Sequence, residues 1–174
     1  HLFKIVVPQC KHVFVRECHL PIAITSDTIA ISSQLRTFKW TDSVAVNGEE
    51  EMSEEIVRSM IDQLPGSYMN VELMQARITT VVDLFEAWMR MNKPTLFALV
   101  LLDRKKEWQE SLLEECQRRG YTHFAHEYEH PLHVCAHMKV NMSTDTVRLF
   151  PVLDVPAKTQ NMPHVQARWF RDFH

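Results

Sequence analysis

The sequence predicts an α+β domain with a mixed, largely antiparallel sheet, one βαβ crossover and about three packed helices. Short apolar and β-branched runs fill the first forty residues, as in strands. Three later segments carry apolar residues at helical spacing, and residues 95–102 read TLFALVLL, a run typical of a strand buried on both faces. With 174 residues, 45% of them hydrophobic, the chain can bury one core unaided, so we expect a single globular domain over residues 1–174.

The N-terminal part is expected to form a meander of antiparallel strands. Its breaks fall at Pro8, at Pro21 and around Ser26, and such residues interrupt strands. The apolar runs between the breaks cover residues 2–7, 12–16, 21–25, 28–32 and 35–40. Residues 41–52 are acidic and polar, and predict an exposed loop.

Two helices are expected in the middle of the chain. Ser53 is a suitable N-cap, glutamates follow it in the first turn, and the helical apolar pattern continues until Pro65. A second helix is expected from Thr80, where a capping-box-like arrangement occurs, to a point before Pro94. Residues 67–74 fit either a strand or a helix.

The apolar run at 95–102 is expected to be the central strand and to begin a βαβ crossover. A third helix is predicted from about residue 104 to 119, and Gly120 is suited to the left-handed position that follows a helix. The crossover would be completed by a strand at 121–128. Two further strands are predicted at 132–140 and 146–153.

The scarcity of glycine excludes the commonest nucleotide-dependent enzymes. Gly48, Gly66 and Gly120 are the three glycines, and they lie far apart. Phosphate-cradling loops need closely spaced glycines, because the backbone must adopt positive φ and approach the anion without a Cβ in the way. P-loop enzymes, Rossmann dehydrogenases and protein kinases are therefore disfavoured.

Charge and cysteine content indicate an intracellular protein, cytoplasmic or nuclear. The formal net charge is −3, which gives no overall attraction to nucleic acid or anionic lipid, and no apolar run is long enough to span a bilayer. Four scattered cysteines do not form a disulfide framework, so reduced thiols are expected. The chain begins with His1 and ends at His174 without a polar tail, which predicts a piece of a longer protein.

The histidine-rich stretch 123–137 is a candidate metal site. On a strand, His133, Cys135 and His137 alternate onto one face, and His126 or His130 could complete a four-ligand set. Imidazole and thiolate are preferred ligands of zinc. The spacing matches no recognised zinc motif, so the alternative is an edge strand without metal, in which Cys135 is a small core residue.

Other groups of residues have both a functional and a structural explanation. A second possible metal set near the N-terminus comprises Cys10, His12, Cys18 and His19, which strand ends near a turn would equally explain. Asp103, with Asp83 or Glu72, could hold magnesium, or could simply start a helix. Cysteine-based catalysis is disfavoured, because Cys116 lies late in a helix, where the dipole opposes a thiolate.

Aromatic and arginine residues alternate near the C-terminus. Such residues anchor protein interfaces or stack on bases. A segment that folds back onto the domain is the structural alternative. The candidate partner-binding residues are Arg168, Trp169, Phe170, Arg171 and Phe173.

These observations favour a non-catalytic intracellular protein-interaction domain of a larger protein, with another protein as partner, no membrane and no cofactor. The partner would bind an exposed strand edge or the aromatic C-terminal segment. The alternative is a zinc- or other metal-dependent nucleic-acid-processing domain centred on residues 123–137. A third hypothesis is a single-stranded nucleic-acid-binding module that uses the C-terminal arginines and aromatics.

Overall fold

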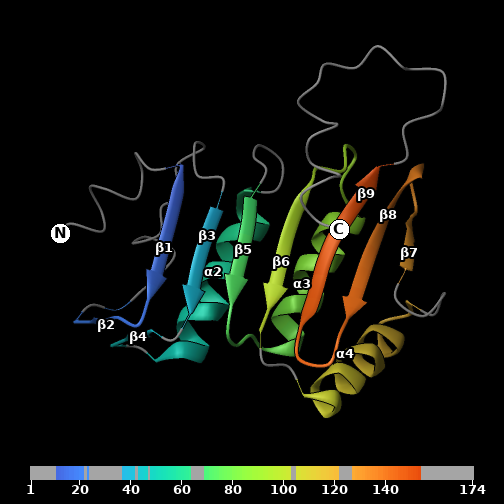
Figure 1. The fold of residues 1–174 in the computed structure, drawn as a ribbon. Coiled ribbons are helices and arrows are strands. Elements are labelled where there is room, and N and C mark those ends of the chain that lie inside the picture. The colour runs from blue at the N-terminus through green and yellow to red at the C-terminus, as the bar shows by residue number, and fades with distance from the viewer. Residues whose placement is uncertain are drawn as a thin grey trace.

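A computed structural model describes residues 11–21, 23, 37–41, 43–46, 48–63, 69–102, 105–121 and 127–153. These parts contain a seven-stranded mixed sheet with strand order β1-β3-β5-β6-β9-β8-β7 (Figure 1). Helices α2 and α3 lie on one face of this sheet, and α4 packs against α3. The predicted α+β class, with both parallel and antiparallel strands and three helices in the described parts, is confirmed.

The strands of the large sheet are β1 (His12–Arg16), β3 (Thr37–Thr41), β5 (Met69–Leu73), β6 (Phe97–Leu101), β7 (Glu127–His130), β8 (His133–Met142) and β9 (Val147–Leu153). A separate parallel pair is formed by β2 (His19–Leu20) and β4 (Val44–Ala45). The helices are α2 (Glu49–Gln63), α3 (Ile78–Met89) and α4 (Lys106–Arg118).

The first half of the sheet is parallel, which corrects the predicted antiparallel meander. β1 pairs with β3, β3 with β5, and β5 with β6, all in parallel. Alternation of apolar residues identifies a strand but carries no information on its direction, which depends on the connection to the next strand. The predicted strands at 2–7 and 28–32 lie outside the described residues.

The βαβ crossovers also lie elsewhere than predicted. They are β3-α2-β5 and β5-α3-β6, whereas the expected partner of β6, the strand β7, lies at the far end of the sheet and runs antiparallel to β6. The reason is that β8 and β9 form an antiparallel pair, and β9 takes the position beside β6. Figure 1 shows β9 and β8 between β6 and β7.

Two helices begin earlier than their capping residues predicted. Helix α2 begins at Glu49, directly after Gly48, which has φ 79°, because the three glutamates favour the first turn of a helix. Ser53 is therefore inside the helix and fully buried. Helix α3 begins at Ile78, and its N-cap residue Arg77 makes no side-chain cap hydrogen bond. The ambiguous segment 67–74 contains the strand β5.

The core lies between the sheet and the helices. Its largest fully buried side chains include Phe38 and Trp40 from β3, and Phe85 and Trp88 from α3. Tyr128 of β7 contacts Phe85 edge to face, with centroids 4.9 Å apart, so the core reaches the last strand of the sheet. None of the described helices is long and apolar enough to cross a membrane.

Candidate interaction site at the β7–β8 edge

The β7–β8 hairpin forms one edge of the sheet and contains most of the predicted metal ligands. β7 pairs with β8 and has no other neighbour among the described strands. The register shifts between Glu129 and His130, because His130 pairs with His133 whereas Glu129 pairs with His137. This bulge determines where each histidine lies.

His130 holds the hairpin turn against the end of α3. Its side chain is buried, and its Nδ1 accepts a hydrogen bond from the main-chain N–H of Leu132 at 3.1 Å. A ring nitrogen that accepts a hydrogen bond carries no proton, so the neutral ring has its proton on Nε2, which donates to the main-chain oxygen of Trp88 at 3.1 Å. Burial lowers the pKa of His130, and the nearby His133 lowers it further.

His133 makes a second connection to the same region. Its Nε2 lies 2.6 Å from the main-chain oxygen of Asn92, in the segment that follows α3, and therefore donates to it. The rings of His130 and His133 are 5.0 Å apart. Two histidines on either side of the hairpin turn thus bind main-chain carbonyl groups in the last turn of α3 and in the segment that follows it.

The two described histidines of the predicted zinc set, His133 and His137, have separate partners. The Nε2 of His137 lies 3.0 Å from the Oε1 of Glu127, and Cys135 is exposed. His126 lies outside the described residues. Within the described parts of the chain, no three His, Cys, Asp or Glu side chains are placed to hold a metal ion.

The hairpin exposes apolar side chains that the sequence reasoning missed. Val134 is 96% exposed and Leu132 is 61% exposed. Strict alternation would have put Val134 on the same face as Ala136 and Met138, which are buried. The bulge between Glu129 and His130 interrupts the alternation of faces, so Val134 does not share the buried face. No residue type in the sequence predicts this bulge.

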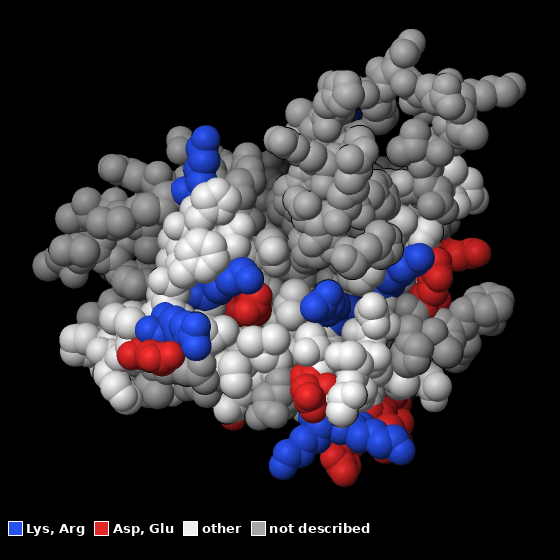
Figure 2. All heavy atoms as spheres, viewed as in Figure 1, with Lys and Arg blue, Asp and Glu red and all other residues white. Residues whose placement is uncertain are grey.

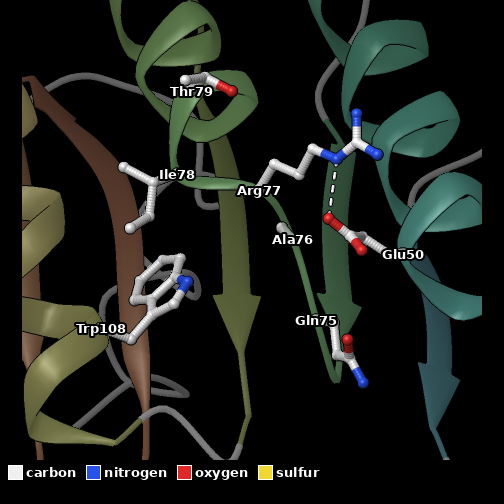
Figure 3. A pocket seen from close by; sticks show the side chains of 7 residues that line it. All are labelled: Glu50, Gln75, Ala76, Arg77, Ile78, Thr79 and Trp108. Carbon is white, nitrogen blue, oxygen red and sulfur yellow. Dashed lines mark hydrogen bonds and ion pairs between the residues drawn. The ribbon is translucent and has the colours of Figure 1, made fainter.

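A shallow cavity of about 460 Å³ lies beyond the end of β5, between the first turns of α2 and α3 and Trp108 of α4 (Figure 3). Arg77 is the cationic side chain in its lining. Its Nε donates to Glu50 at 2.8 Å and its Nη1 to Glu54 at 2.7 Å, and these contacts raise the pKa of Arg77. Two carboxylates therefore balance its charge, and the cavity has no excess positive charge for an anionic ligand.

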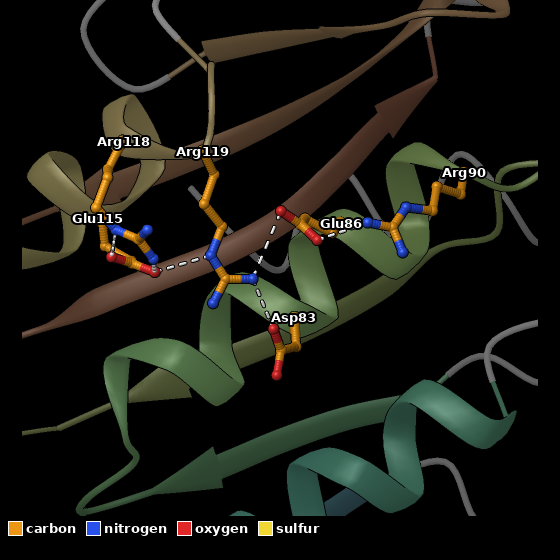
Figure 4. A network of polar contacts seen from close by, with 6 residues as sticks. All are labelled: Asp83, Glu86, Arg90, Glu115, Arg118 and Arg119. Atoms are coloured by element: carbon orange, nitrogen blue, oxygen red, sulfur yellow. Dashed lines mark hydrogen bonds and ion pairs between the residues drawn. The ribbon is translucent and has the colours of Figure 1, made fainter.

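The candidate magnesium ligands are involved in ion pairs within the fold. Asp83 of α3 lies 2.7 Å from Arg119, which also contacts Glu86 and Glu115 (Figure 4). Glu72 lies 2.6 Å from Lys39 on the adjacent strand. Hydrogen bonds from Arg118 and Arg119 lower the pKa of Glu115 to about 2. Asp103 lies outside the described residues.

The cysteines lie in different environments. Cys116 is buried in α4, and burial raises the pKa of its thiol to about 11, which opposes thiolate chemistry. In the proposed N-terminal set, the Sγ of Cys18 donates to the main-chain oxygen of Arg16 at 3.1 Å, and His12 and His19 are exposed. Cys10 lies outside the described residues.

The remaining predicted contact residues, at 168–171 and 173, also lie outside the described residues. On the face seen in Figure 2, the described basic and acidic side chains lie in mixed groups. Comparisons of the chain with protein-family models, with curated proteins and with solved structures find no match.

Proposed function

We propose that the chain is a non-catalytic protein-interaction domain, and that its partner is an extended segment of another protein that adds to the sheet along β7. The observation that supports this proposal is the exposure of Leu132, in the turn that follows the edge strand β7, and of Val134, at the start of β8; they are 61% and 96% exposed. Alternate residues of an edge strand direct N–H and C=O groups away from the sheet, where a partner strand forms hydrogen bonds with them. The two apolar side chains would then bind apolar residues of the partner.

The charges of the edge favour a basic partner. Glu129 of β7 is exposed. Glu127 of the same strand contacts His137 and lies opposite Lys139, but its side chain is still 46% exposed. Cross-strand neighbours of opposite charge stabilise a sheet, whereas like charges destabilise it. The acidic edge therefore disfavours self-pairing of β7 and selects a segment that combines basic and aliphatic residues.

The histidine contacts favour this use of the hairpin. His130 and His133 fix the hairpin to the carboxyl end of α3 through two main-chain oxygens. An edge held in one conformation loses less entropy when a partner binds than a mobile one does. In this proposal the histidines position the binding edge and do not themselves contact the partner.

A photoreactive amino acid at Val134 tests the proposal. In cells that express the chain, we expect it to cross-link one specific protein, whereas the same group at the exposed Gln117 of α4 should not. A synthetic peptide of the cross-linked segment should bind the purified chain. Binding should weaken at least tenfold in the Val134→Asp variant. Glu129→Lys should weaken the binding of a basic peptide, because the lysine repels its positive charge.

The C-terminal aromatic segment, the alternative interface, is tested in the chain of residues 1–174. Trp169→Ala combined with Phe170→Ala should leave peptide binding unchanged if the β7 edge is the interface. Loss of binding in this double variant, with full binding in Val134→Asp, would place the interface in the C-terminal aromatic segment. Equal cross-linking from positions 134 and 117 would contradict an interface at the hairpin.

A further inference from the structure

The opposite end of the large sheet also exposes an apolar side chain. β1 is the outermost described strand at this end and pairs with β3 alone among the described strands (Figure 1). Phe14, in the middle of β1, is 64% exposed, whereas its neighbour Val15 is 8% exposed and belongs to the core. The two side chains lie on opposite faces of the sheet, as alternation requires.

Two hydrogen bonds establish which backbone groups of β1 point outward. The N–H of Thr37 donates to the main-chain oxygen of Lys11 at 3.1 Å, and the N–H of Glu17 donates to that of Thr41 at 3.3 Å. In a parallel ladder, alternate residues direct both backbone groups to the same neighbour. The odd-numbered residues of β1 therefore bond to β3, and the outward groups belong to His12, Phe14 and Arg16.

We propose that β1 pairs antiparallel with β1 of a second copy of the chain, about a two-fold axis at Phe14. In this register Phe14 lies opposite Phe14 of the second copy, and His12 lies opposite Arg16. All of these residues have outward backbone groups, so each pair exchanges two N–H···O=C hydrogen bonds. The two phenylalanine rings become cross-strand neighbours on one face and cover the apolar surface that each copy exposes.

The charges at the ends of β1 favour this register. Lys11 and Glu17 are both exposed and flank the strand. The Glu17 carboxylate also lies 3.1 Å from the Nε of Arg16 in the same chain, an exposed contact that costs little to exchange. In the antiparallel pair, Lys11 of one copy lies opposite Glu17 of the other, and the two-fold axis repeats this contact at the other end. A shift by two residues would lose both contacts and leave one outward-pointing residue of each strand unpaired. The segment is thus complementary to itself.

This inference is independent of the proposed function, because it concerns the opposite edge of the sheet. It is tested by sedimentation equilibrium over a range of concentrations. The wild-type mass should rise from 20.5 kDa towards twice that value. Phe14→Pro should remain monomeric, because proline lacks the outward N–H that donates at the two-fold axis. The hydrogen bonds between β1 and β3 do not use this N–H, so they are kept.

Two controls separate loss of pairing from loss of folding. Phe14→Lys keeps the backbone donor, introduces like charges at the axis and should also be monomeric, with the wild-type circular dichroism spectrum. Val134→Lys changes the other edge and should dimerise like the wild type. A dimer that survives both Phe14 variants, or a wild type that stays monomeric at every concentration, would overturn the inference.

Charge exchange tests the register itself. Lys11→Glu places carboxylates opposite each other, and Glu17→Lys places ammonium groups opposite each other, so each variant alone should dimerise at least tenfold more weakly. An equimolar mixture should dimerise as well as the wild type, because each copy then supplies the charge that the other lacks. Failure of the mixture to recover would contradict this register.

Discussion

The ring of His130 lies edge-on to the indole of Trp88, with centroids 4.8 Å apart, and its Nε2 donates to the main-chain oxygen of the same tryptophan. Trp88 is fully buried near the end of α3, and His130 ends the edge strand β7. One residue pair therefore connects the last strand of the sheet to a central helix, both by packing and by a hydrogen bond.

The stability of the fold should fall in mild acid because of this contact. The pKa of His130 is lowered from 6.5, so near and below that pH the unfolded chain binds a proton that the folded chain does not. The contribution of His130 is thus complete above pH 6.5 and is lost as the pH falls towards the folded-state pKa. Urea unfolding at several pH values measures this loss, which should be smaller in His130→Gln.

Arg119 should contribute more to stability than its neighbour Arg118. The Arg119 side chain is 19% exposed and binds Glu115 through Nε and Asp83 through Nη1, whereas that of Arg118 is 69% exposed and binds Glu115. Lysine cannot reproduce a two-sided contact. We expect Arg119→Lys to lower the free energy of unfolding by about 1–2 kcal/mol, and Arg118→Lys to lower it less. Equal losses in the two variants would contradict the special position of Arg119.

Ser53→Ala should stabilise the protein. The Oγ of Ser53 in α2 is buried without a hydrogen-bond partner among the described residues, and alanine removes this polar atom while raising helix propensity. The expected gain is about 0.5–1.5 kcal/mol, measured by thermal or urea unfolding. Ser59 is also buried in α2 but has a polar interaction, so Ser59→Ala is the matched control and should give no gain. Destabilisation by Ser53→Ala would mean that its hydroxyl has a partner in solution.

The described cysteines should differ sharply in reactivity. Cys135 is exposed, whereas Cys116 is buried with a thiol pKa of about 11, so a neutral-pH thiol reagent should modify Cys135 first. Mass spectrometry of the labelled protein identifies each site. Cys116 should react after denaturation, and Cys135→Ser should remove one rapidly labelled site while leaving the slow labelling of Cys116 unchanged. Rapid labelling of Cys116 in the native protein would show that α4 opens readily.

The sequence predicted the elements better than their arrangement. Apolar spacing identified α4, β6 and β9 close to their observed bounds, because side-chain periodicity is a local property. The direction of β1 relative to β3 was wrong, and so was the position of β7, because neither follows from local pattern. The direction of β1 depends on the connection between β1 and β3, and the position of β7 depends on which strand pairs with the free edge of β6.

At the candidate site, too, the sequence predicted which segment matters but not how its residues are arranged. The histidine stretch correctly drew attention to the β7–β8 hairpin, but residue type could not reveal that His130 and His133 bind main-chain oxygens of Trp88 and Asn92. Those partners lie about forty residues away in the chain. The exposure of Val134 depends on a register shift that alternation alone would not produce.

The pairing of β6 with β9 has a consequence for how the domain folds. β3, β5 and β6 follow one another through short helical crossovers, and β7, β8 and β9 follow one another directly along the chain. The pairing of β6 with β9, for example of Leu101 with Val147, joins these two groups across a long stretch of sequence. Among the described strand pairs, this pairing therefore has the largest entropic cost of loop closure. We expect the two groups to behave as separate cooperative units, and amides along the β6–β9 seam to gain protection last during refolding.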